Sequence, residues 1–270
     1  MAKKIPVETI LHGQKRVDDY AWLENKGAPD VVEYLEAENA YTARMTHATE
    51  ALQKTLYDEM LGRIKEDDST PPYVNGGYTY YWRFEKGKQY TLKTKDLRTN
   101  KLGTEAIPRV ASVEWAKDGK TLLYVTEDEQ TKRSNKLFRH VLGADASKDT
   151  LVYEEKDEMF DLSIDRTRSN AFAIVTSTSR TTSEVRVIDS RKPTSAPVLI
   201  TPREKDHEYY VSHRGDTFYI RTNSGGRNFR LVTAPVADPQ RSKWKELLPH
   251  RTDVMLEGMS LSVDARPHEL

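Results

Sequence analysis

Short β-type segments recur along this chain in units of about fifty residues, and this spacing limits the possible folds more than any other feature. Corresponding positions are occupied by Asp118, Asp165, His213 and Asp264, at steps of 47, 48 and 51 residues. Each unit contains about four short strand-like segments, and turn-rich stretches such as 117–120 and 223–226 separate them. Units of this length are typical of β-propeller blades, although a β-sandwich is a competing interpretation. The pattern therefore predicts a mainly β fold.

The first part of the chain, up to about residue 68, has a helical period instead. Apolar residues recur at helical spacing between Val31 and Met45, and at steps of four between Leu52 and Ile64. We expect a helical segment over 28–64 that starts at Pro29, has a weak joint at 46–49, and packs its apolar residues into a core. Gly62 is a candidate C-terminal residue with positive φ.

After Pro71-Pro72 the period becomes two. Residues 78–84 and 89–94 are expected to form two strands, and residues 85–88 a hairpin turn between them. The loop 223–227 is expected to be a hairpin turn, since it follows a strand and opens no helix.

Charge and composition exclude several classes of partner. Lys and Arg together number 42, as do Asp and Glu, so the net charge is zero and nothing favours nucleic acid or an anionic membrane as the main partner. There are no cysteines, which excludes a disulfide framework, a thiolate metal site and a cysteine nucleophile. No apolar run approaches the length of a membrane span, and the first ten residues do not have the pattern of a secretory signal. We expect a cytoplasmic protein.

No residue pattern predicts chemistry within the chain. The string nearest to a nucleophile elbow, Gly258-Met259-Ser260-Leu261-Ser262, has no second glycine and lies in a strand pattern. The seven histidines have no metal-binding spacing; His12 is expected to be a packing or hydrogen-bonding residue, and His207 part of a loop. The acidic clusters 127–129 and 154–158 are expected to be solvated loops. The sequence therefore predicts no catalytic, cofactor-binding or metal-binding residue and no cofactor.

Several longer strings closely resemble the N-terminal region of the oligopeptidase B group, in the prolyl oligopeptidase family of serine peptidases. The resemblance covers nearly the whole chain. It rests on strings such as Asp18-Asp19-Tyr20-Ala21-Trp22-Leu23, Gly62-Arg63-Ile64-Lys65-Glu66, Gly87-Lys88-Gln89-Tyr90 and Asp253-Val254-Met255-Leu256-Glu257-Gly258.

This resemblance implies an incomplete β-propeller, normally seven-bladed, preceded by an N-terminal α-helical segment. Residues 1–70 would form a helical arm that packs on a C-terminal α/β-hydrolase domain. Residues 71–270 would form about four blades (71–110, 111–156, 157–205 and 206–255) and the start of a fifth at 256–270. The Ser, Asp and His of the family's catalytic triad lie in the C-terminal domain, so the resemblance implies that this chain alone is inactive. The complete enzyme would cleave short peptides after Lys or Arg, with the propeller gating access.

Two departures from the family pattern lead to further expectations. The tail 264–270 does not resemble the family, which suggests truncation or a frameshift. About one blade is absent where Gly87-Lys88-Gln89-Tyr90 runs directly into Thr91-Leu92-Lys93-Thr94, which suggests an in-frame loss. The alternative function is that of a truncated remnant or stand-alone propeller scaffold that binds partners without catalysis.

Overall fold

A computed structural model describes residues 2–75, 78–84 and 91–261 of the chain. The chain divides into two compact units, Met1–Asp68 and Ser69–Leu270. Within the described residues, no helix has the length and apolar character needed to cross a membrane.

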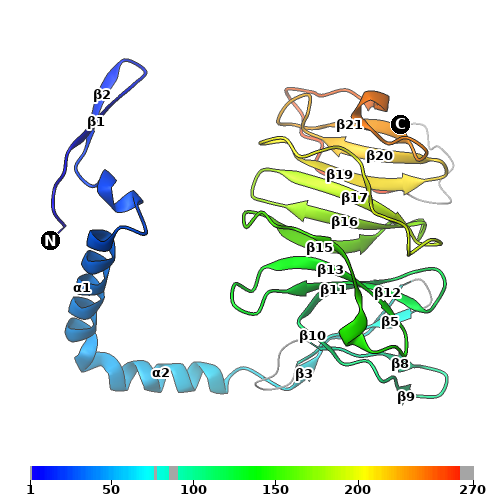
Figure 1. Ribbon diagram of the computed structural model, residues 1–270, viewed down its shortest axis with the longest axis horizontal. Helices are drawn as coiled ribbons and strands as arrows, with labels where there is room; N and C mark the ends of the chain where they lie inside the picture. The colour runs from blue at the N-terminus through cyan, green and yellow to red at the C-terminus, as the bar shows by residue number, and fades with distance from the viewer. Residues whose placement is uncertain (1, 76–77, 85–90, 262–270) are drawn as a thin grey trace. The chain divides into compact units, whose positions relative to one another are not determined.

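The first unit consists of a β-hairpin followed by helices (Figure 1). Strands β1 (Val7–Leu11) and β2 (Gln14–Asp18) pair antiparallel, and a short 3₁₀ turn, η1 (Ala21–Glu24), follows them. His12 and Gly13 form the tight turn of the hairpin, and both have positive φ, at 52° and 77°. His12 is exposed there and does not pack within this unit; the alternative, that it forms hydrogen bonds, stays a prediction.

Two helices with a joint between them occupy the predicted helical segment. They are α1 (Pro29–Thr46) and α2 (Glu50–Gly62), separated by the 3₁₀ turn η2 (His47–Thr49) at the predicted weak joint. Pro29 is the first helical residue of α1, where its missing N–H removes no helical hydrogen bond.

Two details of the helical prediction were wrong. Gly62 does not have the expected positive φ, because it is the last residue of α2 and the chain continues in right-handed conformation at Arg63. The apolar residues of the two helices do not form a core within this unit either. Val31 is the only buried residue of α1, whereas Leu35, Leu56 and other apolar side chains of the helices remain exposed.

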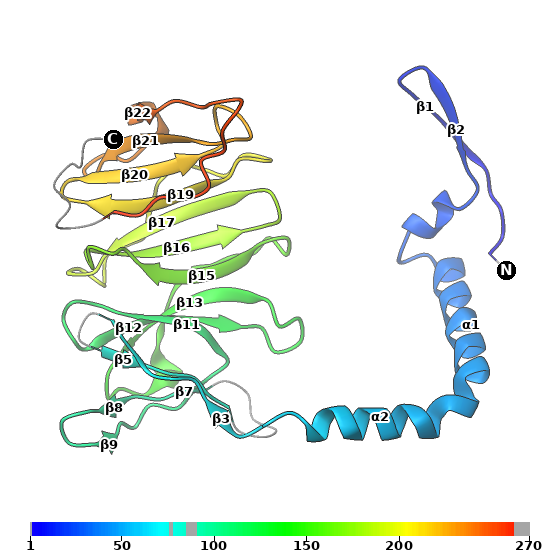
Figure 2. The ribbon, with the colours of Figure 1, turned by 180° about the vertical axis from the view of Figure 1, so that it is seen from behind.

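The second unit contains three four-stranded antiparallel sheets, each formed by strands that follow one another in the chain (Figures 1 and 2). The first sheet comprises β11 (Val110–Trp115), β12 (Thr121–Glu127), β13 (Ser134–Val141) and β14 (Thr150–Glu154). The second comprises β15 (Asp161–Arg166), β16 (Phe172–Thr178), β17 (Ser183–Asp189) and β18 (Val198–Leu199). The third comprises β19 (Tyr209–Arg214), β20 (Thr217–Thr222), β21 (Arg230–Pro235) and β22 (Lys245–Leu248).

The hydrophobic core lies between consecutive sheets. Leu123 and Val125 of the first sheet pack with Leu162 and Ile164 of the second in one buried cluster. A second buried cluster joins the second sheet to the third through residues that include Val185, Val187, Tyr209 and Phe218. Each sheet therefore packs face to face on the next, as blades do in a propeller. A β-sandwich, in which two sheets share one core, does not describe this arrangement.

The described residues between the first unit and the first sheet form short strand pairs. They are β3 (Asp68–Ser69) with β6 (Arg83–Phe84), β4 (Tyr73–Asn75) with β5 (Tyr78–Tyr80), β7 (Thr91–Leu92) with β10 (Ile107–Pro108), and β8 (Lys95–Asp96) with β9 (Lys101–Leu102). The expected strand over 78–84 is thus divided between β5 and β6, and the expected blade over 71–110 is not one four-stranded sheet. The expected turn at 85–88 lies outside the described residues.

The chain after β22 runs without regular secondary structure as far as residue 261, and the remainder of the expected fifth blade lies outside the described residues. The backbone N–H of Leu256 donates to the carbonyl oxygen of Asn228 at 2.8 Å, and Arg221 donates to the carbonyl oxygen of Leu256 at 3.0 Å. These bonds attach the segment to the third sheet. The only helical turns found between the described residues 111 and 255 are the short 3₁₀ turns η3 (Ala146–Lys148) and η4 (Arg241–Lys243), which agrees with a propeller.

Candidate functional site

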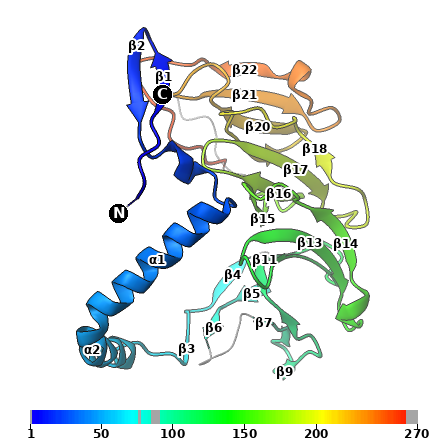
Figure 3. The ribbon, with the colours of Figure 1, turned by 60° about the vertical axis from the view of Figure 1, so that its left-hand side comes forward.

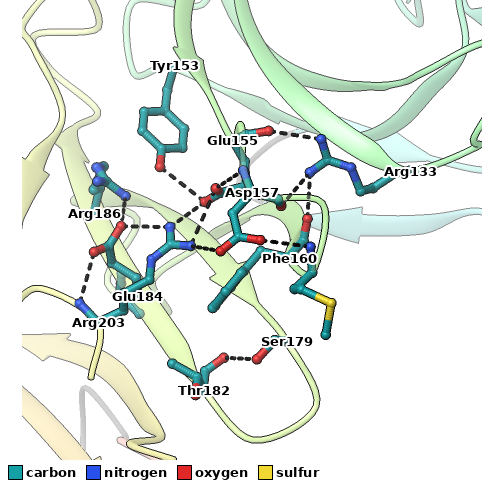
Figure 4. Close-up of polar contacts among 12 residues, drawn as sticks. Arg133, Tyr153, Glu155, Asp157, Phe160, Ser179, Thr182, Glu184, Arg186 and Arg203 are labelled. Atoms are coloured by element: carbon teal, nitrogen blue, oxygen red, sulfur yellow. Dashed lines mark hydrogen bonds and ion pairs between the residues drawn. The ribbon is translucent and has the colours of Figure 1, made fainter. Parts of the chain in front are cut away.

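The most elaborate polar cluster lies at the loops that connect the sheets, and Arg203 is at its centre (Figure 4). Arg203 follows β18, and its guanidinium donates hydrogen bonds to Glu155, after β14, and to Glu184 Oε1 in β17, the latter at 3.1 Å. The backbone N–H of Arg203 also donates to Glu184 Oε2 at 3.0 Å. The guanidinium carbon lies 3.9 Å from the centroid of the Phe160 ring, within the range of a cation–π contact. We call Glu155, Glu184 and Arg203 the carboxylate clamp.

The two carboxylates of the clamp are buried, with 4% and 7% of their side chains exposed for Glu155 and Glu184. Burial alone would raise the pKa of each carboxyl. Hydrogen bonds from Arg203, together with further hydrogen bonds to Glu155 and the charge of Arg186 beside Glu184, outweigh this effect, so that the pKa of both Glu155 and Glu184 lies below its ordinary value. Both groups are therefore ionised at neutral pH, and the clamp holds its charges in hydrogen-bonded pairs.

Arg133 holds the same connecting loop from the first sheet. It precedes β13, and its guanidinium donates to the carbonyl oxygens of Glu155 at 3.1 Å, Asp157 at 3.0 Å and Phe160 at 2.8 Å. The loop 155–160 is thus fixed by Arg133 on one side and by Arg203 on the other. This arrangement fixes the position of the second sheet relative to the first at this end of the strands.

The prediction that the acidic stretch 154–158 is a solvated loop was wrong for Glu155. This residue is buried because Arg203, 48 residues later, supplies a matching charge. Glu155 and Arg203 are 48 residues apart, which is close to the length of one repeat. An acidic residue and an arginine separated by one repeat could therefore have indicated a contact between neighbouring sheets.

Three histidines of the second unit each lie beside a polar side chain. His207 lies in the loop before β19, as expected; it is buried, and its Nε2 lies 2.8 Å from Thr222 Oγ1. His213 Nδ1 lies 2.7 Å from Ser169 Oγ, and burial lowers the pKa of this histidine, so the imidazole is neutral near pH 7. His140 Nδ1 lies 2.8 Å from Asp149 Oδ1. No sequence signal indicated these pairs.

Two further features that the sequence singled out, Ser260 and the loop after β20, have local structural roles. Ser260 Oγ accepts a hydrogen bond from Arg168 Nη1 at 3.0 Å. The loop 223–229 joins β20 to β21 as expected, and Gly226 N–H donates to Asn223 O within it. Within the part of the chain that the structure describes, no group of three or more His, Asp or Glu residues is arranged to hold a metal ion.

Stacked four-stranded sheets with clamped connecting loops define the chain as part of a β-propeller, and the comparison with known families agrees. Residues 1–92 and 88–265 match the N-terminal β-propeller domain of prolyl oligopeptidase. The chain belongs to this family, and it contains an incomplete form of the family's propeller.

Two curated relatives are similar over almost the whole chain. Dipeptidyl aminopeptidase BI of Pseudoxanthomonas mexicana is 33% identical, and the match covers 97% of this chain and 46% of the relative. Protease 2 of Moraxella lacunata is 30% identical, over 96% of this chain and 48% of the relative. Among solved structures, oligopeptidase B from Leishmania major matches with a TM-score of 0.57 and 26% identity, over 93% of this chain and 46% of that chain. The chain thus spans about half the length of the relatives it matches.

These alignments also concern the expected loss of about one blade. The alignment with the P. mexicana protein extends over 339 positions, more than the 270 residues of this chain, so the relative has residues that this chain lacks. The two segments matched by the family overlap at residues 88–92, which is where the sequence indicated the loss.

Proposed function

We propose that this chain is the non-catalytic N-terminal part of a serine oligopeptidase, and that its propeller gates the access of short peptides to an active site on a C-terminal α/β-hydrolase domain. The observation that carries the proposal is the family match over almost the whole chain, combined with coverage of about half of each relative. The clamped sheets support it, because a rigid wall of packed blades can exclude large substrates. We also propose a cytoplasmic location, which cell fractionation tests.

The two units would have different tasks. The first would be a helical arm that packs on the hydrolase domain, and the second would form about four blades of the propeller and the start of another. The arm is supported by the apolar side chains that α1 and α2 leave exposed, among them Leu35 at 51%, Leu52 at 58% and Met60 at 59%. Surfaces of this kind are typical of interfaces.

Cleavage after Lys or Arg is a further part of the proposal, supported by the resemblance to oligopeptidase B. The names of the relatives point to different substrates, since one is a dipeptidyl aminopeptidase. Fluorogenic Arg, Lys and dipeptidyl substrates therefore have to be compared with one another.

The experiment combines the purified chain with the separately expressed C-terminal half of the P. mexicana relative. We expect no turnover by the chain alone, because a triad contributes several orders of magnitude to the rate. We also expect a complex by sedimentation that cleaves short Arg and Lys substrates in preference to long ones. The Leu52→Asp/Met60→Asp variant should not form the complex, whereas the control variant Val141→Asp, in the second unit, should. Turnover by the chain alone that a serine-directed inhibitor blocks would contradict the proposal. If the chain binds other proteins but not the hydrolase half, the alternative of a scaffold that binds partners without catalysis would be favoured.

A further inference from the structure

Glu114 and Arg166 face each other where the first strands of two neighbouring sheets lie side by side. The backbone N–H of Ile164 in β15 donates to Ser112 Oγ in β11 at 3.1 Å. Glu114 and Arg166 each lie two residues further along, and Glu114 Oε2 is 3.3 Å from Arg166 Nε. Only 12% of the Glu114 side chain and 6% of the Arg166 side chain are exposed. Figure 3 shows β11 and β15 on one side of the sheets and β14 and β18 on the other. We call the contact between β11 and β15 the inner seam.

The polar groups at the inner seam are incompletely hydrogen-bonded. Arg166 Nε and Nη2, Glu114 Oε2 and the hydroxyl of Tyr80 have no hydrogen-bond partner among the described residues. The carboxylate clamp lies at the other end of β15, beside the loop 155–160, and its charges are hydrogen-bonded. A buried ion pair without such bonds does not recover the free energy lost when its charges leave water. The ion pair at the inner seam is therefore less stable electrostatically than the carboxylate clamp.

The groups around Glu114 come from two elements. Arg166 and Asp165 lie on β15, and Tyr80 lies on β5. Burial raises the pKa of Glu114 to about 7; Arg166 opposes this rise and Asp165 adds to it. Burial also raises the pKa of Tyr80 to about 12, so this hydroxyl is neutral. Arg166 is therefore the only cation among these groups, and its charge does not offset the burial of Glu114.

We propose that the inner seam is pH-sensitive, and that the ends of β11 and β15 separate more readily once Glu114 has lost its proton. When the seam opens, the carboxyl regains water and ionises with its ordinary pKa of 4.5, whereas in the closed seam its pKa is about 7. The closed state thus binds the proton more tightly, and each rise in pH between these values favours the open state. Above about pH 7 the effect is complete. The seam is tight in mild acid and looser at neutral pH.

Hydrogen exchange tests this directly. Exchange of the amides in 110–115 and 161–166 is measured at pH 5 and pH 7.5, and each rate is corrected for the intrinsic pH dependence of exchange. We expect the equilibrium constant for seam opening to be at least about tenfold larger at pH 7.5 than at pH 5. A carboxyl whose pKa differs by about two units between the closed and the open seam requires this. Amides of β20 and β21, remote from Glu114, serve as the internal reference and should not show this change.

Two variants isolate Glu114. Glu114→Gln has a neutral side chain of the same shape that does not titrate, so exchange at its seam should no longer depend on pH. The matched control is Glu154→Gln, which removes a half-exposed carboxylate 3.7 Å from Lys136 within one sheet and should exchange like the wild type. Equal corrected exchange at both pH values in the wild type, or a pH-dependent change that survives in Glu114→Gln, would overturn the proposal. If Glu114→Gln does not fold, the carboxyl ¹³C shift of Glu114 in the wild type decides: a midpoint near 7 supports the proposal, and a midpoint near 4.5 contradicts it.

Discussion

The hydroxyl of Tyr209, at the start of β19, accepts a hydrogen bond from the backbone N–H of Val185 in β17 at 2.7 Å. The same hydroxyl donates to the carbonyl oxygen of Thr201, also at 2.7 Å. The side chain is fully buried, with 0% exposure. One residue of the third sheet therefore satisfies two backbone groups of the second-sheet segment, and joins these sheets by polar as well as apolar contacts.

Replacing Tyr209 by Phe should lower the free energy of unfolding by about 1–3 kcal/mol, because it leaves a buried N–H and a buried C=O without a partner. Urea unfolding followed by tryptophan fluorescence measures the change. Tyr219→Phe, at a half-buried tyrosine of β20, is the matched control and should change stability by less than about 0.5 kcal/mol. Equal changes in the free energy of unfolding for the two variants would show that the hydrogen bonds of the Tyr209 hydroxyl do not stabilise the fold.

Replacing Arg203 by Met should cost about 3–5 kcal/mol at pH 7, because Glu155 would remain buried without its arginine partner and Glu184 would keep only Arg186. In the wild type, both carboxyls have a lowered pKa, so they stabilise the fold above the ordinary value of 4.5 and lose this contribution as the pH falls below it. In the variant, the other hydrogen bonds of Glu155 and the ion pair between Glu184 and Arg186 remain, but without Arg203 burial has more effect and the pKa of both carboxyls is higher than in the wild type, so acid should cost the variant less stability than the wild type. The difference in unfolding free energy between the wild type and Arg203→Met should therefore be smaller at pH 5 than at pH 7. A constant difference would show that Arg203 does not hold the pKa of these carboxyls down.

Gly226→Ala should destabilise the second unit by about 1–3 kcal/mol, since the backbone conformation is one that side chains rarely adopt. Gly226 has a φ of +146°, and an added Cβ would lie 2.4 Å from His250 Nε2. Gly62→Ala provides a contrast: no atom lies within 4 Å of its Cβ position at the end of α2, and alanine should stabilise the helix by about 0.5 kcal/mol. Thermal unfolding followed by circular dichroism at 222 nm and 215 nm measures both changes.

The isolated chain should self-associate, because α1 and α2 expose apolar side chains that include Leu52 at 58% and Met60 at 59%. Leu52→Lys/Met60→Lys should shift the protein toward monomer at a given concentration, as analytical ultracentrifugation would show. The control Val141→Lys replaces an apolar side chain of similar exposure, 52%, in the second unit. A wild-type protein that is a monodisperse monomer at micromolar concentrations would refute this prediction.

The sequence predicted the features that depend on local periodicity. The positions of α1 and α2, the joint between them and the loop 223–229 followed from apolar spacing and turn residues. The stacking of sheets followed from the repeat, since one unit of about fifty residues can bury its faces only against its neighbours.

The features that the sequence did not predict depend on contacts between units. The acidic stretch around Glu155 has the composition of a solvated loop, and only the position of Arg203 in the next unit makes it a buried pair. The burial of Glu114 likewise depends on the alignment of β11 with β15. Residues 71–110 were predicted as a blade because the segment has the length of one blade and contains strand-like periodicity, but length and periodicity do not determine which strands pair.

The consecutive order of strands within each sheet also bears on synthesis by the ribosome. All four strands of the first sheet lie within 110–154, so they can pair before the second sheet at 161–199 has been translated. At about 5–20 residues per second, each further sheet emerges within several seconds, and the preceding sheet already offers it an apolar surface. The carboxylate clamp can close only once the second sheet has been made, because Arg203 follows Glu155 and Glu184 in the chain. Assembly can thus proceed from the N-terminal sheet onward, and Arg203 then joins the second sheet to the loop that follows the first.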